Sequence, residues 1–281
     1  MGGRDSTLDR YLSSGDQRIE EPSEREEMVS RVIKELGVGC ARTIEEKVDL
    51  QFKSLEKLHR AIDTETFLKL VLANSLVSYQ LTAKGEDWWE EFAEYFSRAG
   101  KRGDELNIVK EYERFLPESR TNRRLTSAKI KRLKKIAPFL EGLSLEDLRR
   151  FYFKDMSGLR DAVAISLGSK KDAKTVVFSI KMFGYAGRIA FGSFVPYPMD
   201  IPIPADSRIE RYTATLTKDP PTVFWSRIAR KTGVPPLHID SILWPVLGGK
   251  REVLERLKEV CGPRRYQLVM NLIGGLIGKP F

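Results

Sequence analysis

The chain has 281 residues, 41% of them hydrophobic and 31% charged, a balance that is typical of a soluble globular protein with a sizeable core and excludes a disordered chain. No run of about 18 apolar residues is present, and the N-terminal segment MGGRDSTLDRYLSSGD lacks the apolar centre of a signal peptide, so we expect no membrane contact and a cytoplasmic location. Two cysteines, Cys40 and Cys261, and two histidines are too few for a disulfide framework or a cysteine-rich metal site, so we expect no cofactor and no metal.

Helical patterns dominate the chain from Ser23 onward. A capping box at Ser23–Glu26 predicts a helix with an apolar face that ends at Gly37. A second capping box at Thr43–Glu46 predicts a helix that runs to residue 62. A nearly all-apolar helix over 63–81 is expected to be buried, and an aromatic-rich helix follows over 84–99. Further helices are predicted at 104–116, 126–141, 145–153, 157–167, 172–185, 206–217, 221–232, 236–248 and 251–277, the last broken at Gly262-Pro263.

The net charge of +9 is divided unevenly. Residues 1–100 hold 14 basic and 20 acidic residues, a net of −6, and residues 101–281 hold 34 and 19, a net of +15. The densest stretch, residues 119–140, is called here the basic stripe; it has no acid and eight cations: Arg120, Arg123, Arg124, Lys129, Lys131, Arg132, Lys134 and Lys135. A solvated helix face is the alternative, but the absence of balancing acids favours a phosphate backbone as the partner.

The segment 188–204 is the one long stretch predicted to be non-helical, because it contains four prolines. A sheet is also disfavoured there, so the fold class is all-α. We expect a loose tail over 1–18 and a single unit over 19–281 made of two helical lobes with a cleft. The acidic lobe covers 19–116 and the basic lobe 117–281, and the C-terminal helices could return to the first lobe.

The sequence from Met156 to Gly187 predicts a helix, a sharp turn and a second helix. The turn consists of Gly168, Ser169, Lys170 and Lys171, and Gly168 suits a left-handed helix end. Free backbone N–H groups at the start of the second helix can bind a DNA phosphate. Many helical hairpins contain a glycine turn, so a purely structural hairpin is the alternative.

Lys174 lies near the start of that second helix, and Asp206 follows the proline-rich segment as the expected N-cap of the next helix. A surface lysine and a capping aspartate are the ordinary interpretations. A lysine amine that is desolvated near other cations can instead attack a sugar C1′, with a carboxylate to relay the proton.

This combination resembles the helix-hairpin-helix DNA glycosylase superfamily. It departs from the common members in its turn, LGSKKDAK, and in the position of Asp206, which lies 32 residues after Lys174, a longer spacing than theirs. The cysteines of the iron–sulfur members are absent. The longer variant is similar to the archaeal 8-oxoguanine DNA glycosylase (AGOG) family over residues 20–278. The resemblance implies a catalytic pair, Lys174 and Asp206, and a base pocket with Gln51, Ser78, Trp89, Phe178, Pro204, Asp240 and Trp244.

The resemblance also implies an activity: excision of 8-oxoguanine through a Schiff base on Lys174, followed by β-elimination. The partner would be duplex DNA that contains 8-oxoguanine, and single-stranded DNA is a further option. We expect the protein to be a monomer. Two other hypotheses remain open at this point. One is a non-catalytic helix-hairpin-helix module that binds duplex DNA, and the other is a glycosylase of the same architecture that acts on another lesion.

Overall fold

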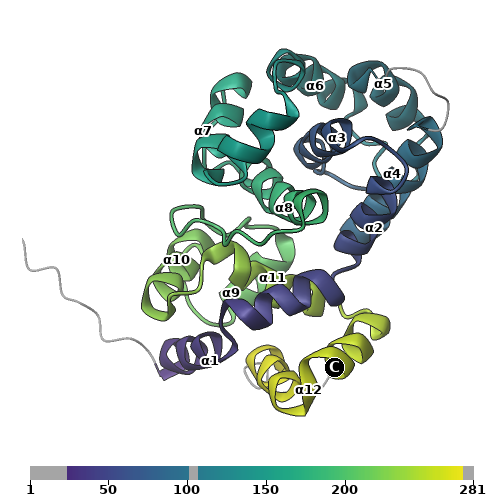
Figure 1. Cartoon of the computed structure of the whole chain (residues 1–281). Coiled ribbons are helices and arrows are strands. Elements are labelled where there is room, and N and C mark those ends of the chain that lie inside the picture. The colour runs from purple at the N-terminus through teal and green to yellow at the C-terminus, as the bar shows by residue number, and fades with distance from the viewer. Residues whose placement is uncertain (1–23, 101–106, 275–281) are drawn as a thin grey trace, which may run out of the picture.

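The structure, a computed structural model, describes residues 24–100 and 107–274, and these residues form helices with no strand among them (Figure 1). None of the described helices is long and apolar enough to cross a membrane. The α-helices are α1 (Glu24–Lys47), α2 (Leu50–His59), α3 (Thr64–Leu76), α4 (Gly85–Gly100), α5 (Ile108–Glu118), α6 (Thr126–Glu141), α7 (Met156–Leu167), α8 (Lys174–Phe191), α9 (Ser207–Ala214), α10 (Pro221–Thr232), α11 (Pro236–Leu247) and α12 (Arg251–Gly274), and a π-helical turn, η1, spans Asp147–Tyr152.

The first two helices divide differently from the sequence prediction. Gly37, with a φ of 63°, kinks α1 where a stop was expected, but the helix resumes and runs on to Lys47. The predicted start at Thr43 is wrong, because the Thr43 hydroxyl donates to the carbonyl of Gly39 inside α1. The true N-cap is Asp49, whose side chain accepts from the backbone N–H of Gln51 (2.9 Å). Ser23 lies outside the described residues.

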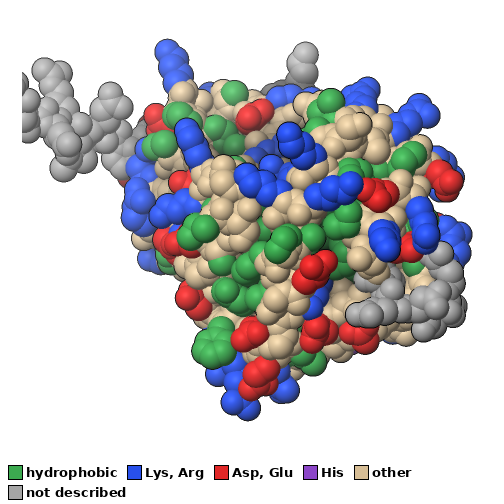
Figure 2. All heavy atoms as spheres, turned by 90° about the horizontal axis from the view of Figure 1, so that it is seen from above, with side chains coloured by type: hydrophobic (Ala, Val, Ile, Leu, Met, Phe, Trp, Pro, Cys, Tyr) green, Lys and Arg blue, Asp and Glu red, His purple; other side chains and the backbone are tan. Residues whose placement is uncertain are grey.

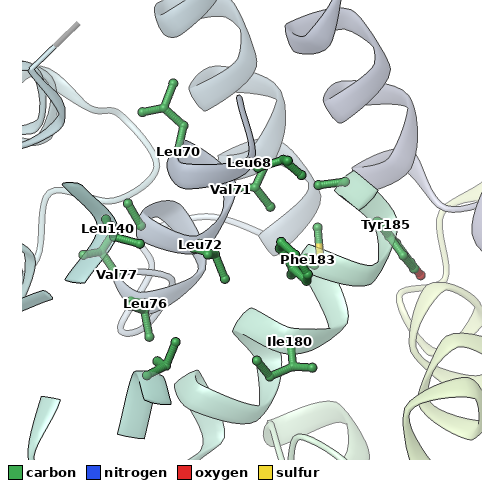
Figure 3. Close-up of a cluster of buried hydrophobic side chains, with 14 of the residues drawn as sticks. Leu68, Leu70, Val71, Leu72, Leu76, Val77, Leu140, Ile180, Phe183 and Tyr185 are labelled. Atoms are coloured by element: carbon green, nitrogen blue, oxygen red, sulfur yellow. The ribbon is translucent and has the colours of Figure 1, made fainter. Parts of the chain in front are cut away.

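The central packing of the fold is between α3 and α8. Val71 and Leu72 of α3 lie toward Ile180 and Phe183 of α8, and all four side chains are buried (Figure 3). Burying each such side chain stabilises the fold by about 1.5–3 kcal/mol relative to leaving it exposed. The prediction that the apolar segment from residue 63 is a buried helix is confirmed, although α3 ends at Leu76 rather than at 81.

The buried hydrophobic side chains form two clusters. One is built from residues 52–201 with Leu237, and the other from residues 29–48 and 203–273. The first cluster therefore includes residues on both sides of position 116, the expected end of the acidic lobe. The hydrophobic core is thus divided differently from the charge. The expected break in the last helix is confirmed, since Gly262 interrupts α12 with a φ of 73°.

Helix α8 is longer than predicted, because it continues to Phe191 instead of ending near 185. Two glycines in this helix allow close packing, since a Cβ on Gly184 would lie 2.3 Å from the Tyr197 ring and one on Gly187 would lie 2.3 Å from Phe153. The two glycines let the proline-rich segment and the η1 region lie directly against the helix. That segment has no helix after Phe191 until α9, as its prolines predict.

A buried ion-pair network joins α8 to the second cluster. The Arg188 guanidinium donates to one oxygen of Glu45 (2.6 Å), and the other oxygen of Glu45 lies 2.8 Å from Nδ1 of His238. Burial would raise the pKa of Glu45, but Arg188 and His238 outweigh it and hold the pKa at about 2. The network fixes α8 relative to α1 and α11, and the cavity described below depends on that relation.

Candidate active site

A cavity of about 340 Å³ opens where α2, α4, α8, α9 and α11 converge with the loop after α3. It falls in the size range of small-molecule sites. The side chains for which the sequence predicted catalytic or base-binding roles all line it: Gln51, Ser78, Trp89, Lys174, Phe178, Pro204, Asp206, Asp240 and Trp244. Tertiary packing thus brings together residues that span almost two hundred positions of the chain.

Helix α8 contributes one face to the cavity. Lys174, Phe178 and Lys181 occur at positions i, i+4 and i+7, so they lie on the same side of the helix. The sequence prediction missed Lys181, although this spacing from Lys174 was a signal for it. Lys174 is exposed, whereas Lys181 is buried deep in the wall.

Lys181 forms a buried ion pair with Asp240 of α11, with Nζ 2.6 Å from Oδ2. Burial would lower the pKa of Lys181, but the carboxylates of Asp240 and Asp49 outweigh it and the pKa is raised. Burial raises the pKa of Asp240 to about 6, against the effect of Lys181. Both groups are therefore charged at neutral pH.

Two acceptors in the cavity wall have no partner. Oε1 of Gln51 and Oδ1 of Asp240 are buried, and neither receives a hydrogen bond from any described residue. An unsatisfied buried polar atom costs about 1–3 kcal/mol. The cavity thus favours a ligand that presents N–H donors to these two oxygens.

Asp206 is held by three hydrogen bonds. As the sequence predicted, it is an N-cap: its Oδ1 accepts from the backbone N–H groups of Arg208 (2.9 Å) and Ile209 (3.0 Å) at the start of α9. Its Oδ2 accepts from the indole Nε1 of Trp244 (2.7 Å). The carboxylate is therefore fixed at the cavity wall.

Aromatic rings form the remaining walls. The buried Trp89 meets Phe178 edge to face, with ring centroids 6.1 Å apart. Arg208 lies 4.2 Å from the ring centroid of Trp244 and makes two contacts to Glu86, of 3.0 and 3.1 Å. Aromatic side chains of this kind supply apolar ring surface against which a heterocycle can pack.

Ser78 lies in the loop that follows α3 rather than inside a helix. Its hydroxyl donates to the carbonyl of Asn74 (2.7 Å) and accepts from Nε1 of Trp88 (2.8 Å). One lone pair of the oxygen is left for a ligand.

The hairpin consists of α7, a turn and α8. Gly168 ends α7 in the left-handed region (φ 55°, ψ 43°), as predicted. The turn residues Ser169, Lys170 and Lys171 border a separate shallow depression, so Gly168–Lys171 lie outside the cavity. The N-cap of α8 is Ala173 and makes no side-chain capping bond, which leaves the first N–H groups of the helix without such a partner.

Fold and cavity together define a class: an all-α helix-hairpin-helix protein with a cavity that an exposed lysine lines. Residues 30–269 match the model of the AGOG family, described as N-glycosylase/DNA lyase. The chain belongs to this family and is an enzyme of the N-glycosylase/DNA lyase type.

Individual relatives agree with this assignment. The N-glycosylase/DNA lyase of Thermococcus kodakarensis is 58% identical over 267 residues, 95% of this chain and 98% of its own length. That of Methanococcus maripaludis is 50% identical over 75% of this chain and 83% of its own. Among solved structures, the 8-oxoguanine DNA glycosylase of Pyrobaculum aerophilum, complexed with 8-oxoguanosine, superposes with a TM-score of 0.69 at 28% identity, covering 83% of this chain and 96% of that one.

Proposed function

We propose that the enzyme excises 8-oxoguanine from DNA and then cleaves the strand, with Lys174 as nucleophile and Asp206 as its carboxylate partner. The observation that carries the proposal is a shared cavity: Lys174 and Asp206 line the same space as the unpartnered acceptors of Gln51 and Asp240. The likeness to a glycosylase solved with 8-oxoguanosine supports the choice of base.

The acceptors suit an oxidised guanine. The Watson–Crick edge of guanine carries N–H donors at N1 and N2, and oxidation at C8 adds an N–H at N7, where guanine itself has a lone pair. Two fixed acceptors on different walls, Gln51 Oε1 and Asp240 Oδ1, can pair with donors on two edges of one base. Unmodified guanine would leave one of them unsatisfied, which costs about 1–3 kcal/mol.

The reaction requires the nucleotide to leave the helix, because its glycosidic bond is not accessible within the base stack. The neutral amine of Lys174 attacks C1′, the C1′–N9 bond breaks, and the base leaves with the electron pair and takes up a proton. Asp206 accepts the proton lost by the Lys174 nitrogen. Lys174 is exposed in the free protein, so its amine is accessible to C1′ of an extruded nucleotide.

Strand cleavage follows from the same intermediate. Opening of the sugar ring gives a protonated imine between C1′ and the Lys174 nitrogen. The imine acidifies C2′, so loss of a C2′ proton expels the phosphate from C3′ by β-elimination. Asp206, held by its three hydrogen bonds, is placed to serve as the base or to stabilise the cationic sugar.

Borohydride trapping on a duplex with one 8-oxoguanine tests the proposal, since reduction of the imine links protein and DNA covalently. We expect the unmodified enzyme to trap and Lys174→Gln to lose trapping, whereas Lys231→Gln, an exposed lysine of α10, traps as before. Equal trapping by Lys174→Gln would disprove the role of this lysine. A panel of other lesions tests the base, and faster excision of one of them would assign the enzyme to that lesion.

The oligomeric state, location and cofactor requirement expected from the sequence are part of the proposal. The enzyme would act as a monomer in the cytoplasm, on nucleoid DNA, without a cofactor. A non-catalytic DNA-binding module is disfavoured, because such a module needs neither the cavity nor its two unsatisfied acceptors.

A further inference from the structure

We propose that Arg132 and Lys135 of α6 form a phosphate-binding site for the DNA backbone, separate from the amides of the hairpin turn. The inference rests on the proposed function only in that the ligand is DNA. The proposed site consists of two of the eight cations in the basic stripe.

Both side chains lie against the hairpin. Nη2 of Arg132 donates to Oγ1 of Thr175 (2.9 Å), the residue directly after Lys174. Nζ of Lys135 lies 2.9 Å from the position that a Cβ on Gly168 would occupy, at the turn itself. Because the two residues are separated by three positions, they lie on one face of α6. That face lies against the hairpin turn and the start of α8.

The charges on this face are not neutralised by the protein. Neither Arg132 nor Lys135 has a carboxylate within 4 Å among the described residues. By contrast, Lys134 pairs with Glu113 of α5 (2.7 Å) and Arg120 lies 3.7 Å from Glu91 of α4. Lys134 and Arg120 are thus compensated by carboxylates, whereas Arg132 and Lys135, the two cations that lie against the hairpin, are not.

Arg132 has surroundings that favour an anionic ligand. It is partly buried, its Nε has no acceptor, and burial lowers the pKa of its guanidinium. A partly desolvated cation without a counter-charge is less stable than a paired one, and an anion that contacts the guanidinium would relieve that cost. The fork of a guanidinium also matches the oxygens of a phosphate.

The location indicates which phosphate would bind. Arg132 and Lys135 flank the helix end from which Lys174 reaches the cavity, so they would hold the strand beside the extruded nucleotide. Figure 2 views the molecule from the side of α5, α6 and α7, and Lys and Arg side chains spread over much of this face. DNA that lies across it would meet the two cations together with the hairpin turn.

The test is a salt titration of binding to an undamaged duplex by Arg132→Ala/Lys135→Ala. Each phosphate contact contributes about 0.9 to the slope of log K against log salt concentration, so we expect the slope to fall by roughly 1.8, with weaker binding to every sequence. The matched control, Arg230→Ala/Lys231→Ala, removes an arginine and a lysine that are exposed on α10, and its slope should stay unchanged. An unchanged slope in the α6 variant, or an equal fall in the control, overturns the proposal.

A second variant tests the geometry without removing charge. Thr175→Val deletes only the acceptor that orients Arg132, and we expect weaker binding at low salt with a nearly unchanged slope. Equal affinity to the unmodified protein would show that this contact does not prepare the site. Thermal unfolding checks that each variant is folded, and Arg132→Lys, which keeps the charge, should retain most of the slope.

The binding assay is independent of the chemistry. It uses undamaged DNA and needs no reaction at Lys174, so a failure of the borohydride experiment would leave the salt titration intact. Conversely, a slope unchanged in the α6 variant would overturn this site while covalent trapping still succeeded.

Discussion

Nε1 of Trp244 donates to Oδ2 of Asp206 over 2.7 Å, which links the wall of the cavity to the carboxylate that caps α9. The other oxygen of Asp206 is occupied by two backbone N–H groups. The carboxylate therefore cannot rotate without losing either the cap or the indole bond. One residue from α11 thus determines the orientation of a residue 38 positions earlier.

Trp244→Phe tests this link, because it keeps an aromatic ring and removes the N–H donor, together with part of the ring volume. A hydrogen bond to a charged group is worth about 1.5–3 kcal/mol, so we expect base release under single-turnover conditions to slow by about 10- to 100-fold. The rate constant should fall more than the affinity for DNA. A variant that is impaired in binding alone would show that Trp244 serves the base and not Asp206.

Asp206→Asn separates the structural role of this residue from its chemical role. The amide oxygen can still accept from the N–H groups of Arg208 and Ile209, although the amide nitrogen cannot accept from the Trp244 indole, so the melting temperature should fall less than in a variant that also loses the cap. Asp206→Ala loses the cap and should be destabilised by about 1 kcal/mol. Both variants should lose covalent trapping. Active Asp206→Asn protein would mean that the carboxylate is only a cap.

The affinity for the base should depend on pH through Asp240. Its pKa of about 6 means that the carboxylate loses its charge below that pH, and the Lys181 ammonium then loses its counter-ion. We expect the affinity for free 8-oxoguanosine to fall as the pH decreases through about 6, as measured by calorimetric titration. Asp240→Asn should bind more weakly at neutral pH and lack this transition. A transition that persists in the variant would assign it to another group.

The same carboxyl has the opposite effect on folding stability. Its pKa is higher in the folded protein than the ordinary value of about 3.9, so the folded state binds more protons between these values. Its contribution to the free energy of unfolding therefore decreases as the pH rises from about 4 to about 6. The difference between the unmodified protein and Asp240→Asn in urea unfolding should show this slope.

Gly184→Ala tests the close packing that supports the cavity. The added Cβ would lie 2.3 Å from the Tyr197 ring, and we expect a loss of about 1–3 kcal/mol in the free energy of unfolding. Gly39→Ala is the control, since nothing lies within 4 Å of that position in α1, and it should stabilise the helix by about 0.5–1 kcal/mol. Equal effects of the two substitutions would contradict the role assigned to the contact.

Sequence alone determined the elements whose signals are local. Gly168 ends α7 because a left-handed conformation favours glycine, and Asp206 caps α9 because its short side chain reaches the next N–H groups. The prolines of segment 188–204 prevented a helix after Phe191. The nine predicted cavity residues were also available from the sequence, through their resemblance to a family.

Tertiary structure decided the properties that depend on contacts between distant residues. The spacing of Lys181 from Lys174 indicates a shared helix face, but only the packing shows that Lys181 pairs with a carboxylate 59 positions away. The charges of the basic stripe were visible in the sequence, but only the packing of α6 against the hairpin separates Arg132, beside Thr175, from Lys134, neutralised by Glu113. The reason is that the pairing and burial of a charge depend on which helices meet, and that is determined by the packing of the whole core.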